Sequence, residues 1–199
     1  MNQDPMTQDD LHLPTDAKTV YFWGAKGGVG TSTVAALHAV ALARAGYPVA
    51  LTGIPPQFAD LAGLLAVPPP TDRVLDVNAA TACPPAPALR PYVVIDGGTD
   101  RGRRHMPSQR YLVIRPCYLA LRRAMETGIT GTQGIVLVAE AQRCLGQRDV
   151  VDVLGLPVVA TMDVTPTTAR CIDAGLIATR MGSRSPLRWV DAAHWATPA

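Results

Sequence analysis

A lysine within a glycine-rich stretch is the feature of this sequence best suited to chemistry. Lysine occurs only twice in the 199 residues, and one of the two, Lys26, lies in the run Gly24-Ala25-Lys26-Gly27-Gly28-Val29-Gly30-Thr31-Ser32-Thr33. Glycines let a backbone wrap closely around phosphate groups, and a compact ammonium among the amides supplies a point charge. The hydroxyl of Ser32 stands where such loops bind magnesium. We therefore expect residues 25–33 to bind phosphates and Ser32 to bind Mg²⁺.

The segments on either side of this stretch predict the elements that position it. Thr19–Trp23 is rich in β-formers and ends at the loop, and Ser32–Arg44 is rich in alanine and leucine. A strand, a loop and a helix are expected, with the positive end of the helix dipole directed at the loop. Tyr47–Thr52 then predicts a second strand and Phe58–Leu65 a short helix. Together these segments form a βαβ unit.

Later apolar runs predict the remaining strands of a mainly parallel sheet. Such runs are continuous in sequence because both faces of a central parallel strand are buried. The expected strands are Tyr92–Asp96, Tyr111–Arg115, Gly134–Val138 and Pro157–Ala160. Helices are expected near 117–130, 147–153 and 166–181. This alternation predicts an α/β fold with a single doubly wound sheet and helices on both faces.

The length and composition indicate one globular domain. We expect this domain at residues 18–184, after a frayed N-terminal tail at 1–17 and before a C-terminal segment at 185–199. Residues 67–91 are rich in proline and are expected to form a largely irregular insertion, with an extended piece at Val74–Val77.

The run from Lys26 to Thr33 resembles the deviant Walker A loop of the ParA/MinD family of P-loop ATPases. With threonine after the last glycine, it is most similar to the TadZ/CpaE branch, which acts in pilus assembly and at septum sites. The resemblance covers most of residues 18–182. Gln57–Ala62 resembles the branch's segment after the second strand, Tyr92–Asp96 resembles its Walker B strand, and Asp173–Gly175 resembles its late helix.

The resemblance implies a P-loop NTPase-like fold with ATP and Mg²⁺ as ligands. Members of the family form ATP-dependent dimers that position plasmids, chromosomes, septa or pili. By resemblance, Lys26 is the signature lysine that reaches the nucleotide of the partner subunit, Gly27 to Gly30 cradle phosphates, and Ser32 holds the ion. Asp96 supports that ion through a water molecule. A nucleotide-dependent homodimer that recruits an unidentified protein partner is expected.

Two departures from the family pattern bear on activity. The family carries a second lysine where this chain has Thr31, and loss of one charged hydrogen bond typically costs about 1.5–3 kcal/mol. The family also carries an aspartate for the attacking water after the second strand, where this chain has Thr52-Gly53-Ile54-Pro55-Pro56. The nearest acid is Asp60. The loop Gly97-Gly98-Thr99 remains able to sense a γ-phosphate.

Three functional hypotheses follow. The first is an ATP-binding switch with weak or absent hydrolysis, and the second is a catalytically inactive scaffold that acts only through protein–protein interaction. In the third, a partner supplies the missing catalytic group to a slow ATPase that yields ADP and phosphate. A glycine-rich turn without a ligand is the alternative for the loop. A dinucleotide site is disfavoured, because the loop lacks G-x-G-x-x-G in register and no acid ends the second strand.

The charge distribution and one missing asparagine bear on which partners and which nucleotide base the chain could bind. The net charge of +2 does not indicate a general nucleic-acid binder, although Arg101, Arg103, Arg104 and His105 lie together. This patch could bind DNA backbone or protein, or form a solvated loop. The family's adenine-reading asparagine has no match near Ala139-Glu140, so base specificity stays open.

Four separated cysteines indicate neither a zinc site nor a disulfide framework. The N-terminal segment lacks the features of a secretory signal, and no apolar run predicts a membrane span. The apolar residues Leu187, Trp189, Val190 and Trp195 are expected to pack in the core or an interface, with a short membrane-surface helix as the alternative. We expect a cytoplasmic protein.

Overall fold

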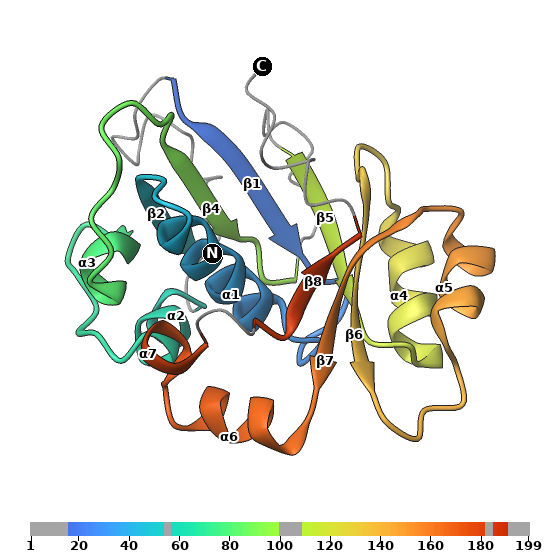
Figure 1. Ribbon diagram of the computed structural model, residues 1–199. Coiled ribbons are helices and arrows are strands. Elements are labelled where there is room, and N and C mark those ends of the chain that lie inside the picture. The colour runs from blue at the N-terminus through green and yellow to red at the C-terminus, as the bar shows by residue number, and fades with distance from the viewer. Residues whose placement is uncertain (1–15, 54–56, 100–108, 182–184, 191–199) are drawn as a thin grey trace.

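One eight-stranded sheet forms the centre of the part of the chain that the computed structural model describes, residues 16–53, 57–99, 109–181 and 185–190 (Figure 1). The strands are β1 (Lys18–Trp23), β2 (Val49–Gly53), β3 (Leu75–Asp76), β4 (Tyr92–Asp96), β5 (Gln109–Ile114), β6 (Gly134–Glu140), β7 (Val158–Val164) and β8 (Leu187–Trp189). Their order is β3-β2-β4-β1-β5-β6-β7-β8, and only the two edge strands run antiparallel to their neighbours. The mainly parallel sheet predicted from the sequence is confirmed.

Helices connect the strands in both directions from β1. They are α1 (Thr31–Arg44), α2 (Gln57–Leu64), α3 (Val77–Thr81), α4 (Tyr118–Thr127), α5 (Gln147–Leu154), α6 (Pro166–Asp173) and α7 (Ile177–Arg180). The chain moves to one edge of the sheet through α1 and to the other edge through α4 and α5. Right-handed crossovers then place α1 and the α4–α5 pair on opposite faces. Figure 1 shows α4 and α5 together, apart from α1. The fold is therefore doubly wound.

The two directions of winding separate at β1, which pairs with β4 on one side and β5 on the other. Ligands of open α/β sheets bind in the crevice beyond the carboxyl end of such a switch point. The loop from Gly24 to Gly30 lies at this end of β1. The topology thus places the glycine-rich stretch where this class of fold binds ligands.

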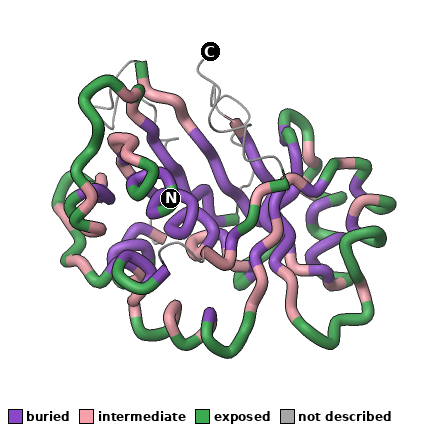
Figure 2. Tube along the Cα trace, in the orientation of Figure 1, coloured by how far each residue is buried: buried purple, intermediate pink, exposed green. Residues whose placement is uncertain are grey.

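Helix α1 is the most deeply buried helix of the described chain (Figure 2). Small side chains make this possible, because Ala35, Ala36 and Ala39 let the helix lie close to the sheet with no exposed surface. Contacts from α1 reach β1, β2 and β4 as well as α2, α3 and α7. The core therefore fixes the N-terminus of α1, which follows the glycine-rich loop directly.

The structure differs from the sequence expectations in three places. Residues 67–91 contain helix α3, which was not expected and whose Asp76 N-cap accepts a hydrogen bond from Ala79 N–H (3.1 Å), whereas strand β3 lies within the extended piece expected at Val74–Val77. The helix expected at 166–181 divides into α6 and α7, because Gly175 adopts a left-handed φ of 67°. Residues 187–189 form β8, an antiparallel edge strand that the sequence did not predict.

The aromatic side chain of β8 packs across the sheet. Trp189 has ring-centroid distances of 5.2 Å to His38 and 5.4 Å to Tyr111, and His38 contacts Phe22 edge-on at 5.4 Å. These contacts confirm the expected packing of Trp189, and Leu187 is buried as expected, whereas Val190 is 75% exposed and does not pack in the core. Trp195 lies outside the described residues. His38, on α1, is thus a core histidine held among aromatic rings.

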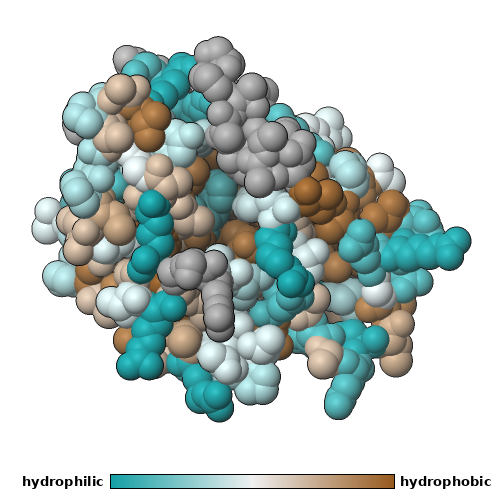
Figure 3. All heavy atoms as spheres, viewed as in Figure 1, coloured by the Kyte–Doolittle hydropathy of each residue, from teal (hydrophilic) through white to brown (hydrophobic). Residues whose placement is uncertain are grey.

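The surface view in Figure 3 shows hydrophilic side chains between smaller hydrophobic patches. The large apolar side chains that are most exposed in the described chain lie mainly on α4 and α5 and after β8: Tyr118, Leu119, Met125, Val153 and Val190. No helix within the described ranges has the length and apolar character needed to span a bilayer.

Burial of His38 predicts a pH-dependent stability. Desolvation lowers the pKa of His38 from 6.5 to about 3, so between these values the unfolded chain binds a proton that the folded chain excludes. The contribution of neutral His38 is complete above pH 6.5 and is lost as the pH falls. In urea unfolding from pH 7 to pH 4, the wild type should lose about 1.4 kcal/mol per pH unit relative to His38→Leu. Parallel curves for the two proteins would contradict this assignment.

Candidate phosphate-binding site

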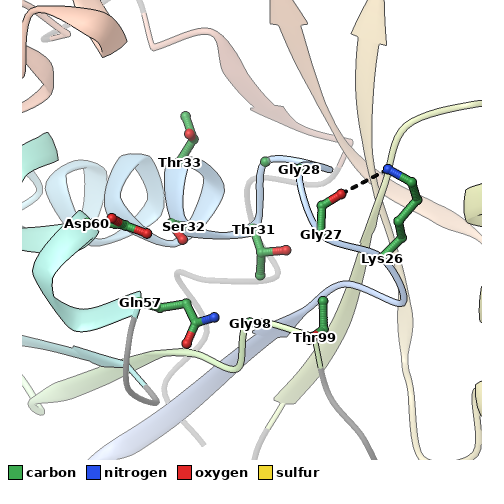
Figure 4. A pocket seen from close by; sticks show the side chains of 11 residues that line it. Lys26, Gly27, Gly28, Thr31, Ser32, Thr33, Gln57, Asp60, Gly98 and Thr99 are labelled. Carbon is green, nitrogen blue, oxygen red and sulfur yellow. Dashed lines mark hydrogen bonds between the residues drawn. The ribbon is translucent and has the colours of Figure 1, made fainter.

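A pocket of about 270 Å³ opens where the carboxyl end of β1 meets the N-terminus of α1. Its walls come from three segments: the glycine-rich loop with the first turn of α1, the start of α2, and the loop after β4. Figure 4 shows the side chains at this pocket. The residues that line it are Lys26, Gly27, Gly28, Gly30, Thr31, Ser32, Thr33, Gln57, Asp60, Gly98 and Thr99.

Glycine is required at two kinds of position in the loop. Gly28 and Gly30 have φ angles of 76° and 98°, which side chains with a Cβ rarely adopt. Gly24 has no room for a side chain, because a Cβ there would lie 2.6 Å from Val29 Cγ2 and 2.7 Å from Thr31 Oγ1. The glycines therefore set the path of the loop as well as its flexibility.

The backbone of the loop presents unused hydrogen-bond donors. Within the described part of the chain, no hydrogen bond is found from the backbone N–H groups of residues 25–33, and the first helical bond of α1 runs from Val34 N–H to Gly30 carbonyl (2.9 Å). The amides of the first turn of a helix have no intrahelical acceptor. The dipole of α1 adds partial positive charge at the same point. Unpartnered amides and a positive dipole end together suit the binding of an anion, and phosphate is the anion that such loops commonly bind.

Lys26 lies at the rim of the pocket. Its side chain is exposed, and Nζ donates to the carbonyl of the adjacent Gly27 at 3.1 Å (Figure 4). No ion pair of Lys26 is found among the residues that the structure describes. The ammonium is therefore available to a ligand or to a second protein chain.

Asp96 ends β4 behind the pocket and is completely buried. Its Oδ1 accepts a hydrogen bond from Gly98 N–H (2.9 Å), whereas Oδ2 has no partner among the described residues. Burial raises the pKa of Asp96, and the nearby Asp60 raises it further, while hydrogen bonds from Ser32 and Gly98 lower it. A buried carboxylate oxygen without a partner is costly in an empty site, and a bound cation would relieve the cost.

Two backbone hydrogen bonds join the loop after β1 to the loop after β4. Gly24 N–H donates to Gly98 carbonyl (2.8 Å), and Gly97 N–H donates to Phe22 carbonyl (2.7 Å). A Cβ on Gly97 would lie 2.4 Å from the Tyr21 hydroxyl oxygen, so only glycine fits there. The backbone at the end of β1 and the start of its loop is thus bonded directly to the backbone after β4.

The donor groups at the inner end of the pocket fit a magnesium ion. Magnesium prefers hydroxyl, carboxylate and water oxygens, usually with one or two carboxylates. Ser32 and Asp60 face the pocket from α1 and α2, and Asp96 lies behind Ser32. In such a site Ser32 would hold the ion and Asp96 would support it through water.

The two departures noted in the sequence have structural counterparts. Thr31 is nearly buried, and its hydroxyl oxygen packs toward Gly24, so no charge extends from this position into the pocket. Thr52 is committed as a donor to Arg73 carbonyl (2.8 Å), and a Cβ on Gly53 would crowd Leu61 at 3.0 Å. Residues 54–56 lie outside the described ranges. The nearest described carboxylate after β2 is that of Asp60.

The structure brings most of the expected binding residues together. Lys26, Gly27, Gly28, Gly30, Thr31, Ser32 and Thr33 line the pocket. The side chain of Val29 instead enters the core, and Ala25 is half-buried beside it. Sequence reasoning named Gln57 only as the start of the segment Gln57–Ala62 that resembles the family branch, and it did not predict that Gln57 lines the pocket. The patch from Arg101 to His105 lies outside the described residues.

No protein-family model matches the sequence, and no curated protein matches it significantly. Solved structures do match the fold. MinD from Pyrococcus horikoshii, complexed with Mg-ADP, has 17% identity and a TM-score of 0.63 over 85% of this chain and 90% of that chain. The MinC:MinD complex of Aquifex aeolicus gives 16% identity and a TM-score of 0.61 over 80% and 86% of the respective chains. A ParA-family ATPase of Chlorobium tepidum has 16% identity and a TM-score of 0.58 over 86% of this chain and 95% of that chain.

These likenesses show the fold. The chain has the P-loop NTPase-like α/β fold of these structures, and its own glycine-rich loop lies between β1 and α1.

The raised pKa of Asp96 predicts that this carboxylate destabilises the protein when no ligand is bound. An acid whose pKa is higher in the folded state gains stability as the pH falls and loses it as the pH rises. Asp96→Asn retains an oxygen that can accept from Gly98 N–H. Its free energy of unfolding at pH 7, measured in urea, should therefore equal or exceed that of the wild type, and the difference should close toward pH 4.

Asp152→Asn on α5 provides the control, because Asp152 is largely exposed. It should change the unfolding free energy by less than about 0.5 kcal/mol at every pH. A loss of more than about 1 kcal/mol in Asp96→Asn would show instead that the carboxylate stabilises the fold.

Proposed function

We propose that this chain is an ATP-binding switch of the ParA/MinD type, which forms a nucleotide-dependent homodimer and positions or recruits a protein partner. One observation carries the proposal: residues 26–28 and 30–33, whose amides have no acceptor within the described chain, line the same pocket as the Ser32 hydroxyl, which lies beside buried Asp96. Anion donors and cation ligands are thus side by side, as a magnesium polyphosphate requires.

Different residues of the pocket contact different parts of the proposed ligand. The amides of Gly27, Gly28 and Gly30 cradle the phosphates, and the dipole of α1 favours their negative charge. Ser32 and Asp96 are the ligands for Mg²⁺, directly and through water. MinD from Pyrococcus horikoshii was solved with Mg-ADP, which supports the same ligand class here.

Lys26 supports the dimer. In the deviant Walker A pattern, the lysine at this position acts on the nucleotide of the partner subunit. Its exposed ammonium, whose one hydrogen bond within the described ranges is to the neighbouring Gly27 carbonyl, can reach outward in this way. Dimerisation across the nucleotide would then depend on bound triphosphate.

Hydrolysis is slow or absent in this proposal. Efficient hydrolysis requires a positioned group that orients or deprotonates the attacking water. Thr52 and Gly53 provide no carboxylate, and Thr31 provides no charge for the β- and γ-phosphates. The site therefore retains most of the groups that would bind a nucleotide but lacks the carboxylate that would activate water for hydrolysis. A protein partner that supplies the missing group would increase turnover.

The partner is a protein in a positioning system. MinD of Aquifex aeolicus was solved in complex with MinC, and a ParA-family ATPase shares the fold. Together with the threonine of the TadZ/CpaE-like loop, these likenesses favour partitioning, septum-site or pilus-type localisation in the cytoplasm. The patch of Arg101, Arg103, Arg104 and His105, which the sequence left open to DNA or to protein, lies outside the described residues.

The rival function is a scaffold that keeps the fold but no longer binds nucleotide. Thr31 is the observation that favours it, because this position has turned inward and carries no charge. The two functions differ in one measurable property, which is whether the pocket binds Mg-ATP.

Substitution of Lys26 tests the proposed function. Titration of the full chain with Mg-ATP by calorimetry should give saturable binding in the micromolar range, and Lys26→Ala should weaken it at least about tenfold. Light scattering should show a dimer with Mg-ATP for the wild type and a monomer for the variant.

The second lysine of the chain is a matched control. Lys18 begins β1 at the opposite end of the strand from the loop, with its ammonium 5.9 Å from the centre of the Tyr92 ring. Lys18→Ala should bind Mg-ATP as the wild type does. If the wild type shows no binding at millimolar nucleotide, the scaffold function is correct and the switch is wrong.

Restoring the charge at position 31 should strengthen binding. Thr31→Lys supplies the ammonium that the family places beside the β- and γ-phosphates, so the affinity for Mg-ATP should rise about tenfold to a hundredfold. Thr31→Met, which has similar length and no charge, is the control and should bring no gain. Equal affinities of the two variants in calorimetry would show that the pocket does not use charge at this position.

A further inference from the structure

The first residue of α2 occupies a wall of the pocket that the phosphate loop does not cover. Gln57 is half-buried and points toward Gly98, across the pocket from Gly28 and Thr33 (Figure 4). Among the described residues that line the pocket, it is the only one with a side-chain amide. Its amide makes no hydrogen bond to another described residue, so within the described chain its two donors and its acceptor are not committed to another group.

Gln57 and Gly98 fit each other closely. A Cβ on Gly98 would lie 2.7 Å from Gln57 Nε2 and 2.8 Å from its Cδ, which is closer than any side chain could approach. Gly98 also has a φ of 57°, in the left-handed region. The absence of a side chain at position 98 therefore creates the space that the amide fills.

This pair is linked directly to the other parts of the site. Gly98 N–H donates to Asp96 Oδ1 (2.9 Å), and Gly98 carbonyl accepts from Gly24 N–H (2.8 Å). A group that contacts Gln57 thus lies next to Gly98, which is bonded both to Asp96 and to Gly24 at the start of the glycine-rich loop. Displacement of the amide would be felt on both sides.

We infer that Gln57 is the specificity-determining residue that distinguishes a nucleoside triphosphate from a diphosphate in this pocket. This inference rests on the proposed function. The amides of residues 25–33 supply enough donors for the two phosphates of a diphosphate, and the terminal phosphoryl group of a triphosphate is the one that reaches the opposite wall. There the Gln57 amide donates to one of its oxygens or to a water beside it. An amide cannot accept a proton, so Gln57 recognises the terminal phosphate without acting as a base.

The affinities of two nucleotides test the assignment. Calorimetry of the full chain with Mg-ADP and with the non-hydrolysable analogue Mg-AMPPNP gives the ratio of dissociation constants. Gln57→Ala should weaken AMPPNP about tenfold and leave ADP within about twofold, because a hydrogen bond to a charged oxygen is lost only with the triphosphate. Gln57→Glu should weaken AMPPNP further, because its carboxylate repels the terminal phosphate.

Gln147→Ala is the matched control, since Gln147 is likewise the first residue of its helix, α5, but is exposed and does not line the pocket. It should leave both dissociation constants unchanged. Thermal unfolding of each variant shows whether the fold is kept, and Gln57→Glu, which has the same shape as the wild type, serves if Gln57→Ala does not fold.

The outcomes separate this inference from the function on which it rests. Binding of both nucleotides by the wild type, with equal losses or no losses in the Gln57 variants, overturns the role of Gln57 and leaves the switch intact. Equal affinity of the wild type for ADP and AMPPNP would likewise overturn the role of Gln57 without affecting the proposed switch. A wild type that binds neither nucleotide overturns the proposed function and this inference together.

Discussion

The close approach of two backbone loops is the constraint on which the rest of the site depends. Gly24 N–H donates to Gly98 carbonyl, and both sides of this contact require glycine: a Cβ on Gly24 would collide with Val29 and Thr31 of its own loop, and a Cβ on Gly97 would collide with Tyr21 of β1. This contact holds the N-terminus of α1 beside the end of β4. The anion-binding amides, the Ser32 hydroxyl and the Asp96 carboxylate meet as a result, although they come from distant parts of the sequence.

The site is arranged at a cost to stability that the surrounding core must offset. Asp96 is buried with one oxygen unpartnered, and the amides of residues 25–33 have no acceptor within the described chain. Packing supplies the compensation, because β4 is buried along its whole length and α1 lies on the sheet through alanines. Buried or backbone polar groups are normally hydrogen-bonded, and unpartnered polar groups gathered at one place in an otherwise well-packed fold are typical of a functional site. A chain selected only as a scaffold would gain by replacing Asp96.

The sequence predicted the fold well, and it predicted the glycine-rich loop between β1 and α1, because both depend on local patterns. The apolar run Tyr92–Asp96 and the glycines of the loop each determine backbone conformation within a few residues. Two features escaped prediction because they depend on distant partners. Strand β8 exists through Trp189, which packs on His38 and Tyr111, and nothing near Trp189 in sequence indicates this. Gln57 likewise gains its role only from Gly98, on another strand's loop.

The charges at the pocket indicate that nucleotide and magnesium must bind together. Lys26 is the only cationic side chain among the described residues that line the pocket, whereas Asp60 faces it and Asp96 lies directly behind. A polyphosphate alone would bring several negative charges toward two carboxylates with one exposed ammonium to balance them. A loop with a second lysine would share this burden, but Thr31 cannot. The proposed switch is therefore expected to bind the magnesium complex of the nucleotide in preference to the free anion.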